Sequence, residues 1–251
     1  MNRKLAAPVV NAVVLRVDGG LQTLLWRRAD VPDLWSLPGG FVRDGESLGG
    51  ATRRHLLEKV GVSEVGHVEQ LDTTSSADTH PDLWLLDVTH LALIPRGADL
   101  HTPPDTSWHP VDALPPIAFG HAAAVARALE RLRGKLSYTN VGFALAPPRF
   151  TLRELAEIYE AVLGYAVDAT HLRRVLERDH LIAPTGERRS TGGRPAEDHV
   201  VAHGGGSFFE AVPGVVWFLG KIFLVLSMFN AQRGHEGGDS GFQNGGCVIA
   251  A

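Results

Sequence analysis

The 251-residue sequence predicts a mixed α/β domain followed by a smaller domain of two helices and a β-hairpin. Over the first 118 residues, β-rich apolar runs alternate with an amphipathic helical segment. From residue 150, two helical segments separated by a short turn precede a hairpin pattern with a basic, glycine-rich turn. We therefore divide the chain into an α/β domain (1–135), a linker (136–149), a second domain (150–202) and a tail (203–251).

Composition is that of an ordinary globular protein, with 44% hydrophobic and 21% charged residues. The single cysteine, Cys247, excludes an intrachain disulfide and favours a reducing, cytoplasmic location. The N-terminal apolar run is interrupted by Asn11 and lacks a cleavage pattern, so we expect a β-strand there and not a signal peptide.

Hydrophobic spacing and turn residues define the elements of the first domain. They are strands at 9–17 and 21–28, a loop with a short strand at 32–42, a helix at 47–61, a buried strand at 83–94, an irregular proline-rich connection at 107–116 and a helix at 120–136. Asp18-Gly19-Gly20 predicts the hairpin turn, and Gly61 ends the first helix. Ala51, Leu56, Leu57 and Val60 have helical spacing in the first helix, and Val125, Leu129 and Leu132 share one face of the second, amphipathic helix.

The second domain has strong helix signals. Thr151 and Glu154 have capping-box spacing, Phe150 and Leu155 have the spacing of a hydrophobic staple, and Asp168 can cap a second helix. The expected buried residues are Leu155, Ile158, Tyr159, Val162, Leu172, Val175 and Leu176. A basic hairpin at 181–201 follows, so the order of elements predicts a winged helix-turn-helix.

Charge is concentrated in this part of the chain. Residues 127–194 carry 12 Lys and Arg against 8 Asp and Glu, although the whole chain has a net charge of −4. A basic module between acidic neighbours favours a polyanionic partner, and a winged helix favours double-stranded DNA. We expect base contacts or phosphate contacts from Arg153, Thr170, His171, Arg173, Arg174, Arg188, Arg189 and Arg194.

The segment "LPGGFVRDGESLGGATRRHLLEKVGV" at 37–62 has a regular pattern of glycines, charged residues and aliphatic residues. It resembles the Nudix box, at 40–62, in a match carried by Gly40, Glu46, Arg54, Leu56, Glu58, Gly61 and Val62. This resemblance implies that the first domain is a Nudix α/β/α sandwich. In active Nudix enzymes, carboxylates of the box helix hold divalent cations against a diphosphate.

Only one of the three helix carboxylates of that pattern is present. The three positions are occupied by His55, Glu58 and Lys59, which place a histidine and a cation where metal ligands are expected. We therefore expect no catalytic residues, no bound metal and no enzyme activity. Gly39 and Gly40 still allow close backbone approach of a nucleotide diphosphate, and Arg28, Trp35 and Lys59 could contact its phosphates or an adenine face. Arg54 can order the loop by pairing with Glu46 or Glu58. The expected effector-binding residues are Arg28, Trp35, Gly39, Gly40, Arg54 and Glu58.

A degenerate Nudix box followed by a winged helix is similar to the NrtR family of transcriptional regulators of NAD metabolism. Further support comes from "RRADVPDLWSLPGGFV", "VDALPPIAFGHAAAVARALERLRGKLSYTNVGFAL" and "PTGERRSTGGRPA". The resemblance implies a homodimeric repressor without a cofactor that binds a palindromic operator near NAD synthesis or salvage genes. It also implies that ADP-ribose or a related NAD metabolite bound in the Nudix domain releases the repressor.

Two alternatives remain open from the sequence. One is an active Nudix hydrolase, an ADP-ribose pyrophosphatase that uses Glu46 and Glu58 with an unusual metal set. The other is a catalytically silent scaffold that binds protein or RNA. The loop "TSSADTHPDLW" lacks the arginine usual in the family, which leaves the effector open.

The tail departs from the family pattern after "GRPA". Its apolar run at 208–229 is interrupted by Glu210, Pro213 and Lys221, so we expect no transmembrane helix and no membrane partner. Buried packing, a dimer contact and a non-native C-terminal extension remain open for this run. The change in composition suggests a frameshifted or artificial C-terminus, and we expect the glycine-rich end to be disordered.

Overall fold

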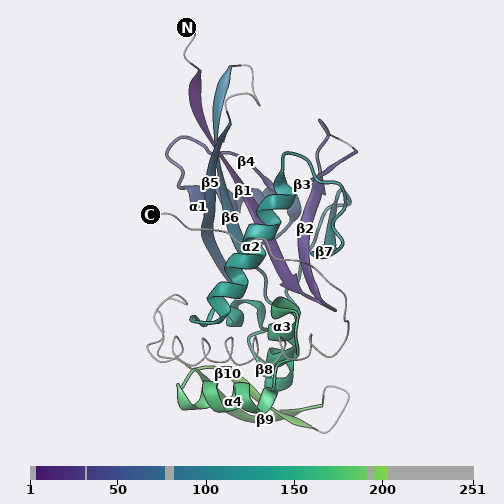
Figure 1. Ribbon diagram of the computed structural model, residues 1–251, viewed down its shortest axis with the longest axis vertical. Helices are drawn as coiled ribbons and strands as arrows, with labels where there is room; N and C mark the ends of the chain where they lie inside the picture. The colour runs from purple at the N-terminus through teal and green to yellow at the C-terminus, as the bar shows by residue number, and fades with distance from the viewer. Residues whose placement is uncertain (1–3, 32, 77–81, 191–194, 203–251) are drawn as a thin grey trace, which may run out of the picture.

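The computed structural model describes residues 4–31, 33–76, 82–190 and 195–202. The strands are β1 (Leu5–Val17), β2 (Leu21–Arg27), β3 (Trp35–Ser36), β4 (Gly39–Phe41), β5 (His67–Ser76), β6 (Leu83–Leu93), β7 (Thr106–Pro110), β8 (Phe150–Thr151), β9 (Ile182–Arg189) and β10 (Ala196–Val201). The helices are α1 (Leu48–Val60), α2 (His121–Leu136), the 3-10 helix η1 (Val141–Leu145), α3 (Leu152–Leu163) and α4 (Ala169–Arg178). Figure 1 shows α3, α4 and strands β8 to β10 together at one end of the large sheet.

The large sheet has seven strands, with β1 at its centre. The path runs β3-β2-β1-β6-β5, and β4 and β7 pair with β1 and β2. β1 and β6 are parallel, with Leu15 opposite Leu93, and the pairs β1–β2, β2–β7 and β5–β6 are antiparallel. Gly19 and Gly20 have φ of 64° and 146° in the predicted hairpin turn, a conformation that side chains disfavour.

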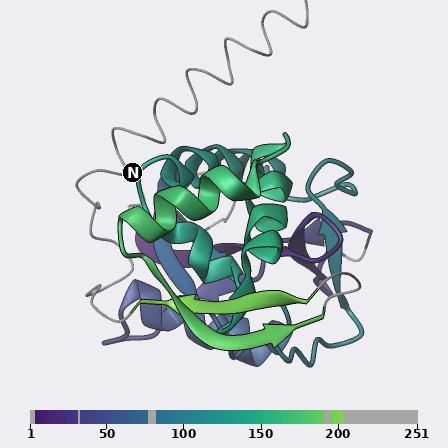
Figure 2. The same cartoon turned by 90° about the horizontal axis from the view of Figure 1, so that it is seen from below.

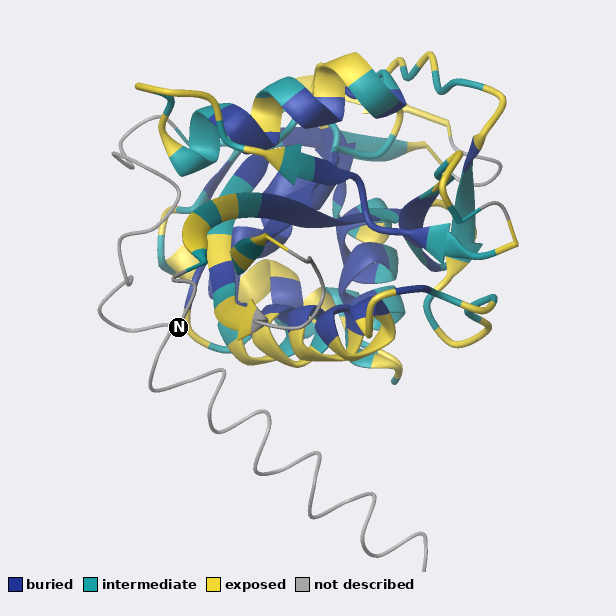
Figure 3. Ribbon diagram, turned by 90° about the horizontal axis from the view of Figure 1, so that it is seen from above, coloured by how far each residue is buried: buried dark blue, intermediate teal, exposed yellow. Residues whose placement is uncertain are grey.

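Alternation along β1 buries both faces of this sheet. Ala12 and Val14 pack with Leu56 and Val60 of α1, whereas Val13, Leu15 and Val17 belong to the cluster that contains α2. The buried positions follow the strands and the inner surfaces of the helices on either side (Figure 3). The predicted α/β/α sandwich is therefore confirmed.

The second domain is a winged helix, as predicted. Thr151 and Glu154 form both bonds of the capping box, and Asp168 Oδ1 accepts from the Thr170 backbone amide at 2.8 Å. Gly164, with φ of 81°, ends α3 before the short turn to α4. β9 and β10 pair antiparallel as the wing below the two helices, and β8 pairs with β10 (Figure 2).

The segment between the two domains is buried. All five residues of η1, in the predicted linker, are buried, and the Phe143 and Phe150 rings stack with centroids 5.8 Å apart. Arg133 Nε of α2 donates to the Val162 carbonyl of α3 at 2.8 Å, and Arg96 pairs with Glu157 at 3.1 Å. One hydrophobic cluster thus extends from β1 through η1 into α3 and α4.

Several sequence predictions about the first domain were wrong or incomplete. Residues 107–110, predicted as irregular, belong to β7, because pairing with β2 satisfies their backbone groups. Leu57, which shares the helical spacing of Leu56 and Val60 in the sequence, is 56% exposed, because α1 turns Leu56 and His55 inward. Leu129 is only partly buried, and β5 was not predicted.

No helix among the described residues is long and apolar enough to span a membrane. The tail predictions, including those for 208–229 and Cys247, fall outside the described residues.

Candidate functional site

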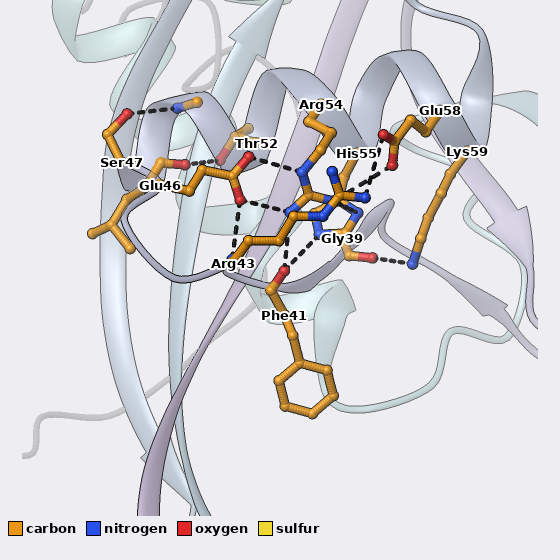
Figure 4. A network of polar contacts seen from close by, with 12 residues as sticks. Gly39, Phe41, Arg43, Glu46, Ser47, Thr52, Arg54, His55, Glu58 and Lys59 are labelled. Carbon is orange, nitrogen blue, oxygen red and sulfur yellow. Dashed lines mark hydrogen bonds and ion pairs between the residues drawn. The ribbon is translucent and has the colours of Figure 1, made fainter.

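Helix α1 and the loop before it form the first candidate site (Figure 4). Ser47 caps the helix by accepting from the Gly50 amide at 3.1 Å, and Gly61 ends it with φ of 67°. A Cβ on Gly61 would lie 2.1 Å from the His101 carbonyl oxygen, so this end of the helix tolerates only glycine. The caps therefore fix which side chains of α1 face the loop.

Arg54 and Glu46 lock the loop onto α1. Arg54 Nε and Nη2 donate to the two Glu46 carboxylate oxygens at 2.8 and 2.7 Å, a bidentate pair. The Arg43 amide donates to Glu46 at 3.1 Å, and Arg54 also donates to the Phe41 carbonyl at 3.1 Å. The hydrogen bonds from Arg54 lower the Glu46 pKa to about 2. The predicted pairing of Arg54 is confirmed, and it organises the loop.

The side chains at the three helix positions of the box contact the same loop but differ in charge and in ligand type. His55 is buried, with Nε2 3.1 Å from the Phe41 carbonyl, and burial lowers its pKa. Glu58 pairs with Arg43 and Arg54 at 3.5 Å. Lys59 Nζ donates to the Gly39 carbonyl at 2.5 Å and lies 4.8 Å from the centroid of the Trp26 ring. One carboxylate, one imidazole and one ammonium do not make an oxygen-ligand set for a hard divalent cation.

The glycines of the loop are explained by packing inside the protein. A Cβ on Gly39 would lie 2.2 Å from both Asn11 Oδ1 and the Val10 carbonyl oxygen. A Cβ on Gly40 would lie 2.7 Å from His55 Cε1 and 3.1 Å from Lys59 Nζ. Backbone atoms therefore require glycine at 39, whereas at 40 a side chain would have to displace His55 and Lys59. A ligand contact at either glycine stays a prediction.

Of the other predicted effector residues, Arg28 lies near Lys59, whereas Trp35 packs against the cluster that contains α2. Arg28 binds both oxygens of Asp30 at 2.8 and 2.6 Å, and its guanidinium lies 5.1 Å from the Phe119 ring centroid. Trp35 is half-buried, with Arg27 over its ring at 4.7 Å and the His109 ring at its edge. Phe119 was missed from the sequence. It is 55% exposed and has φ of 59°, which is uncommon for an aromatic residue.

The second candidate site is the basic face of the winged helix. Thr170, Arg173 and Arg174 are exposed on α4, and His171 is half-buried. Arg173 Nε binds Glu177 at 2.8 Å, one turn further along α4. These positions lie on the outer face of the helix, opposite its buried Leu172, Val175 and Leu176.

A groove of about 400 Å³ lies between the start of α3, α4 and the wing. Three of the predicted arginines line it: Arg153, Arg173 and Arg188. The other lining residues are Leu152, Gly186, Ala196, Glu197 and His199. The Arg153 side chain is 72% exposed and pairs with Glu157 of its own helix at 3.2 Å. The fold thus brings three arginines from separate segments to one groove, which suits a phosphate.

Arg189 differs from the other wing arginines. Its guanidinium binds Glu154 at 2.8 Å and Asp198 at 3.1 Å, so it ties the wing to the capping box of α3. Arg188 is exposed and donates to the Pro195 carbonyl at 3.0 Å. Arg194 falls outside the described residues.

Comparisons with known proteins match both halves of the chain. A family model described as NUDIX domain matches residues 6–129, and one described as NrtR DNA-binding winged helix domain matches residues 142–198. The chain is 33% identical over 198 residues to the "ADPR responsive transcriptional repressor NtrR" of Acinetobacter baylyi, covering 75% of this chain and 79% of that protein.

Solved structures resemble the whole two-domain arrangement. Shewanella oneidensis NrtR has a TM-score of 0.69 with 32% identity, covering 77% of this chain and 93% of that one. The same protein complexed with a 27mer DNA has a TM-score of 0.67 with 31% identity, covering 77% and 92%. A MutT/nudix family protein from Enterococcus faecalis, at 21% identity and a TM-score of 0.63, shares the fold alone.

The fold and its two sites define a class of protein in which a Nudix domain is joined to a DNA-binding winged helix. Within that class, the identity and coverage relative to the Acinetobacter baylyi protein are decisive. The chain belongs to the NrtR family.

Proposed function

We propose that this protein is a transcriptional repressor of NAD biosynthesis or salvage genes, released from DNA by ADP-ribose or a related NAD metabolite. The proposal is carried by one observation: a single hydrophobic core joins the Nudix domain to a basic winged helix. In that Nudix domain, Lys59 occupies a helix position where a metal-binding carboxylate is expected. The Acinetobacter baylyi relative is named as an ADPR responsive repressor, and the Shewanella oneidensis relative was crystallised with DNA.

In this proposal, α4 lies in the major groove. Thr170, Arg173 and Arg174 are exposed on it and reach base edges, with His171 at the side of the same face. Arg153 and Arg188 hold backbone phosphates across the groove described above. Arg189 acts mainly by fixing the wing, and Arg194 is assigned to the wing contacts from the sequence alone.

In this proposal, the effector is bound but not hydrolysed. Arg28, Trp35, Gly39, Gly40, Arg54 and Glu58 form its surroundings, and no cofactor or catalytic residue is assigned. His55 and Lys59 replace the box carboxylates, and Arg43 and Arg54 already neutralise Glu58, so hydrolysis of the ligand is not expected.

The same proposal includes a homodimer. A two-fold symmetric pair of winged helices would read the two halves of a palindromic operator. Effector binding reaches the winged helix through the buried contacts of η1 and α3, because these elements share their core with β1.

Mobility shift on DNA upstream of the protein's own gene and of NAD genes tests the proposal. We expect a shift at low salt that ADP-ribose reverses, and loss of the shift in the Arg173→Ala/Arg174→Ala variant. Arg178→Ala is the matched control, because Arg178 lies at the end of α4, is 47% exposed and pairs with Asp179. No shift with any fragment would refute the repressor. Rapid Mg²⁺-dependent release of AMP from ADP-ribose would instead support a hydrolase.

A further inference from the structure

We propose that the Lys59 ammonium replaces the divalent cation of the Nudix site, so that this chain binds the diphosphate of a nucleotide without metal. The inference rests on the proposed function, because it concerns how the same effector is held. It starts from the position of Lys59 on the face of α1 that turns toward the loop of Gly39 and Gly40 (Figure 4).

The carboxylates around the site are already neutralised by arginines. Asp30 is bound by Arg28 at 2.6 Å, and Glu46 is bound by Arg54 at 2.7 Å. Glu58 lies 3.5 Å from both Arg43 and Arg54. A divalent cation entering here would have to displace these arginines, and no oxygen ligand is free of a cationic neighbour among those three carboxylates.

Lys59 is the cation of the site that lacks such a partner. Among the described residues, no carboxylate oxygen lies within ion-pair distance of its ammonium, which instead contacts the Gly39 carbonyl and the Trp26 ring. Burial lowers the Lys59 pKa, and repulsion from Arg28 and Arg54 lowers it further, against smaller opposite effects of Asp30 and Glu58. A partly desolvated cation of this kind is stabilised when an anion arrives.

The location matches what a diphosphate requires. Lys59 Nζ lies 3.1 Å from the position that a Gly40 Cβ would occupy, so the ammonium is directly beside the glycine loop. An ammonium has three donors, and the Gly39 carbonyl uses one of them. The remaining donors can bind phosphate oxygens, as lysines do in other phosphate sites. Arg28 and Arg43 also lie at the site, but each is paired with a carboxylate, which leaves Lys59 as the cation without one among the described residues of the site.

A divalent cation beside Lys59 would be repelled by the ammonium, because the two positive charges would lie close together in a partly desolvated site. The ammonium and the metal are therefore alternatives, and a chain that carries one has no room for the other. The ligand is still a nucleoside diphosphate compound, as in the Nudix fold. The positive charge that balances its phosphates is supplied by the Lys59 side chain and not by a bound metal ion.

Calorimetric titration of the full chain with ADP-ribose tests this, once in EDTA and once in Mg²⁺. We expect equal affinity in the two buffers for the unmodified protein. Lys59→Met keeps the aliphatic stem and should weaken binding about tenfold or more in EDTA, the loss expected for a charge-assisted hydrogen bond. Arg53→Met is the matched control, because Arg53 is an exposed cation on the same helix, and its affinity should not change.

Lys59→Glu restores the box carboxylate and gives the sharper result. Its ADP-ribose affinity should be low in EDTA and should recover when Mg²⁺ is added. Thermal unfolding of each variant shows whether it is folded, and Lys59→Arg, which keeps the cation, should retain binding in EDTA. Binding by the unmodified protein only in Mg²⁺, or unchanged affinity of Lys59→Met, would overturn the inference and leave the repressor intact. No ADP-ribose binding in either buffer would overturn the effector assignment itself.

Discussion

Leu155 lies on α3 of the winged helix, yet it is fully buried in the same hydrophobic cluster as Val13 and Leu15 of the central strand β1. Leu155→Ala would leave a cavity in that shared core. For a fully buried leucine the free energy of unfolding should fall by about 3 kcal/mol. Because the cluster is continuous, we expect this loss to be felt by both domains and not by the winged helix alone.

The tryptophans allow the first domain to be followed separately. Trp26, Trp35, Trp84 and Trp108 all belong to strands of the large sheet. With Trp217 replaced by Phe in every variant, urea unfolding followed by fluorescence reports the first domain, and far-ultraviolet circular dichroism reports the whole chain. We expect both signals in Leu155→Ala to shift together to lower urea by the same free energy.

The control is Leu57→Ala, which removes the same atoms from a leucine that is 56% exposed and should cost less than about 1 kcal/mol. An unchanged fluorescence transition in Leu155→Ala, with an early step seen only by circular dichroism, would refute the shared core. The winged helix would then be an independently folding unit, and the proposed route from effector to DNA would lose its physical basis.

Three further predictions concern charge. Burial of Glu69 raises its pKa, but hydrogen bonds from His67 and Lys135 outweigh this and lower the pKa to about 2. Because the folded pKa is depressed, Glu69 stabilises the fold above pH ~5, by about 1 to 2 kcal/mol after solvent screening, and this contribution is lost as pH falls toward 2. Urea unfolding of Glu69→Gln at several pH values should therefore show a deficit at pH 7 that shrinks in acid, and a pH-independent deficit would contradict this. Arg153→Ala should weaken binding to all DNA sequences alike and reduce the slope of log K against log salt by about 1, measured by anisotropy; a sequence-selective loss would assign Arg153 to base readout instead. Arg173→Ala/Arg174→Ala should abolish operator binding but leave the calorimetric affinity for ADP-ribose unchanged, and loss of both would mean that the two sites are not separate.

Local signals predicted the winged helix well. Thr151 and Glu154 are three residues apart, Asp168 immediately precedes its helix, and both caps depend only on neighbours in the chain. Strands β5 and β7 were missed because their stability comes from partners far away in sequence. β5 buries little of its own apolar surface, with Leu71 as its buried hydrophobic residue, and it is held by pairing with β6.

The site was predictable in composition but not in arrangement. The motif identified His55 and Lys59 as departures, but only the structure shows that the Lys59 ammonium is directed at the Gly39 carbonyl. Spacing gave Arg54 two candidate partners, and the geometry makes Glu46 the bidentate one. Phe119 carried no motif, because its exposed ring and positive φ arise from the turn that leads into α2.

Arg189 illustrates the same limit on the basic face. Its position in the wing suggested a DNA contact, whereas in the fold it binds Glu154 and Asp198. A count of arginines cannot distinguish a side chain that is committed to the fold from one, such as Arg174, that is exposed on α4.

The central claim is that a nucleotide bound at the α1 site controls DNA binding by the winged helix. Fluorescence anisotropy of a labelled promoter fragment, titrated with the full chain at fixed salt, measures this directly when it is repeated with ADP-ribose in EDTA. We expect tight DNA binding without the nucleotide and a clear loss of affinity with it, in the absence of metal. Equal affinity for DNA with and without saturating ADP-ribose would contradict it.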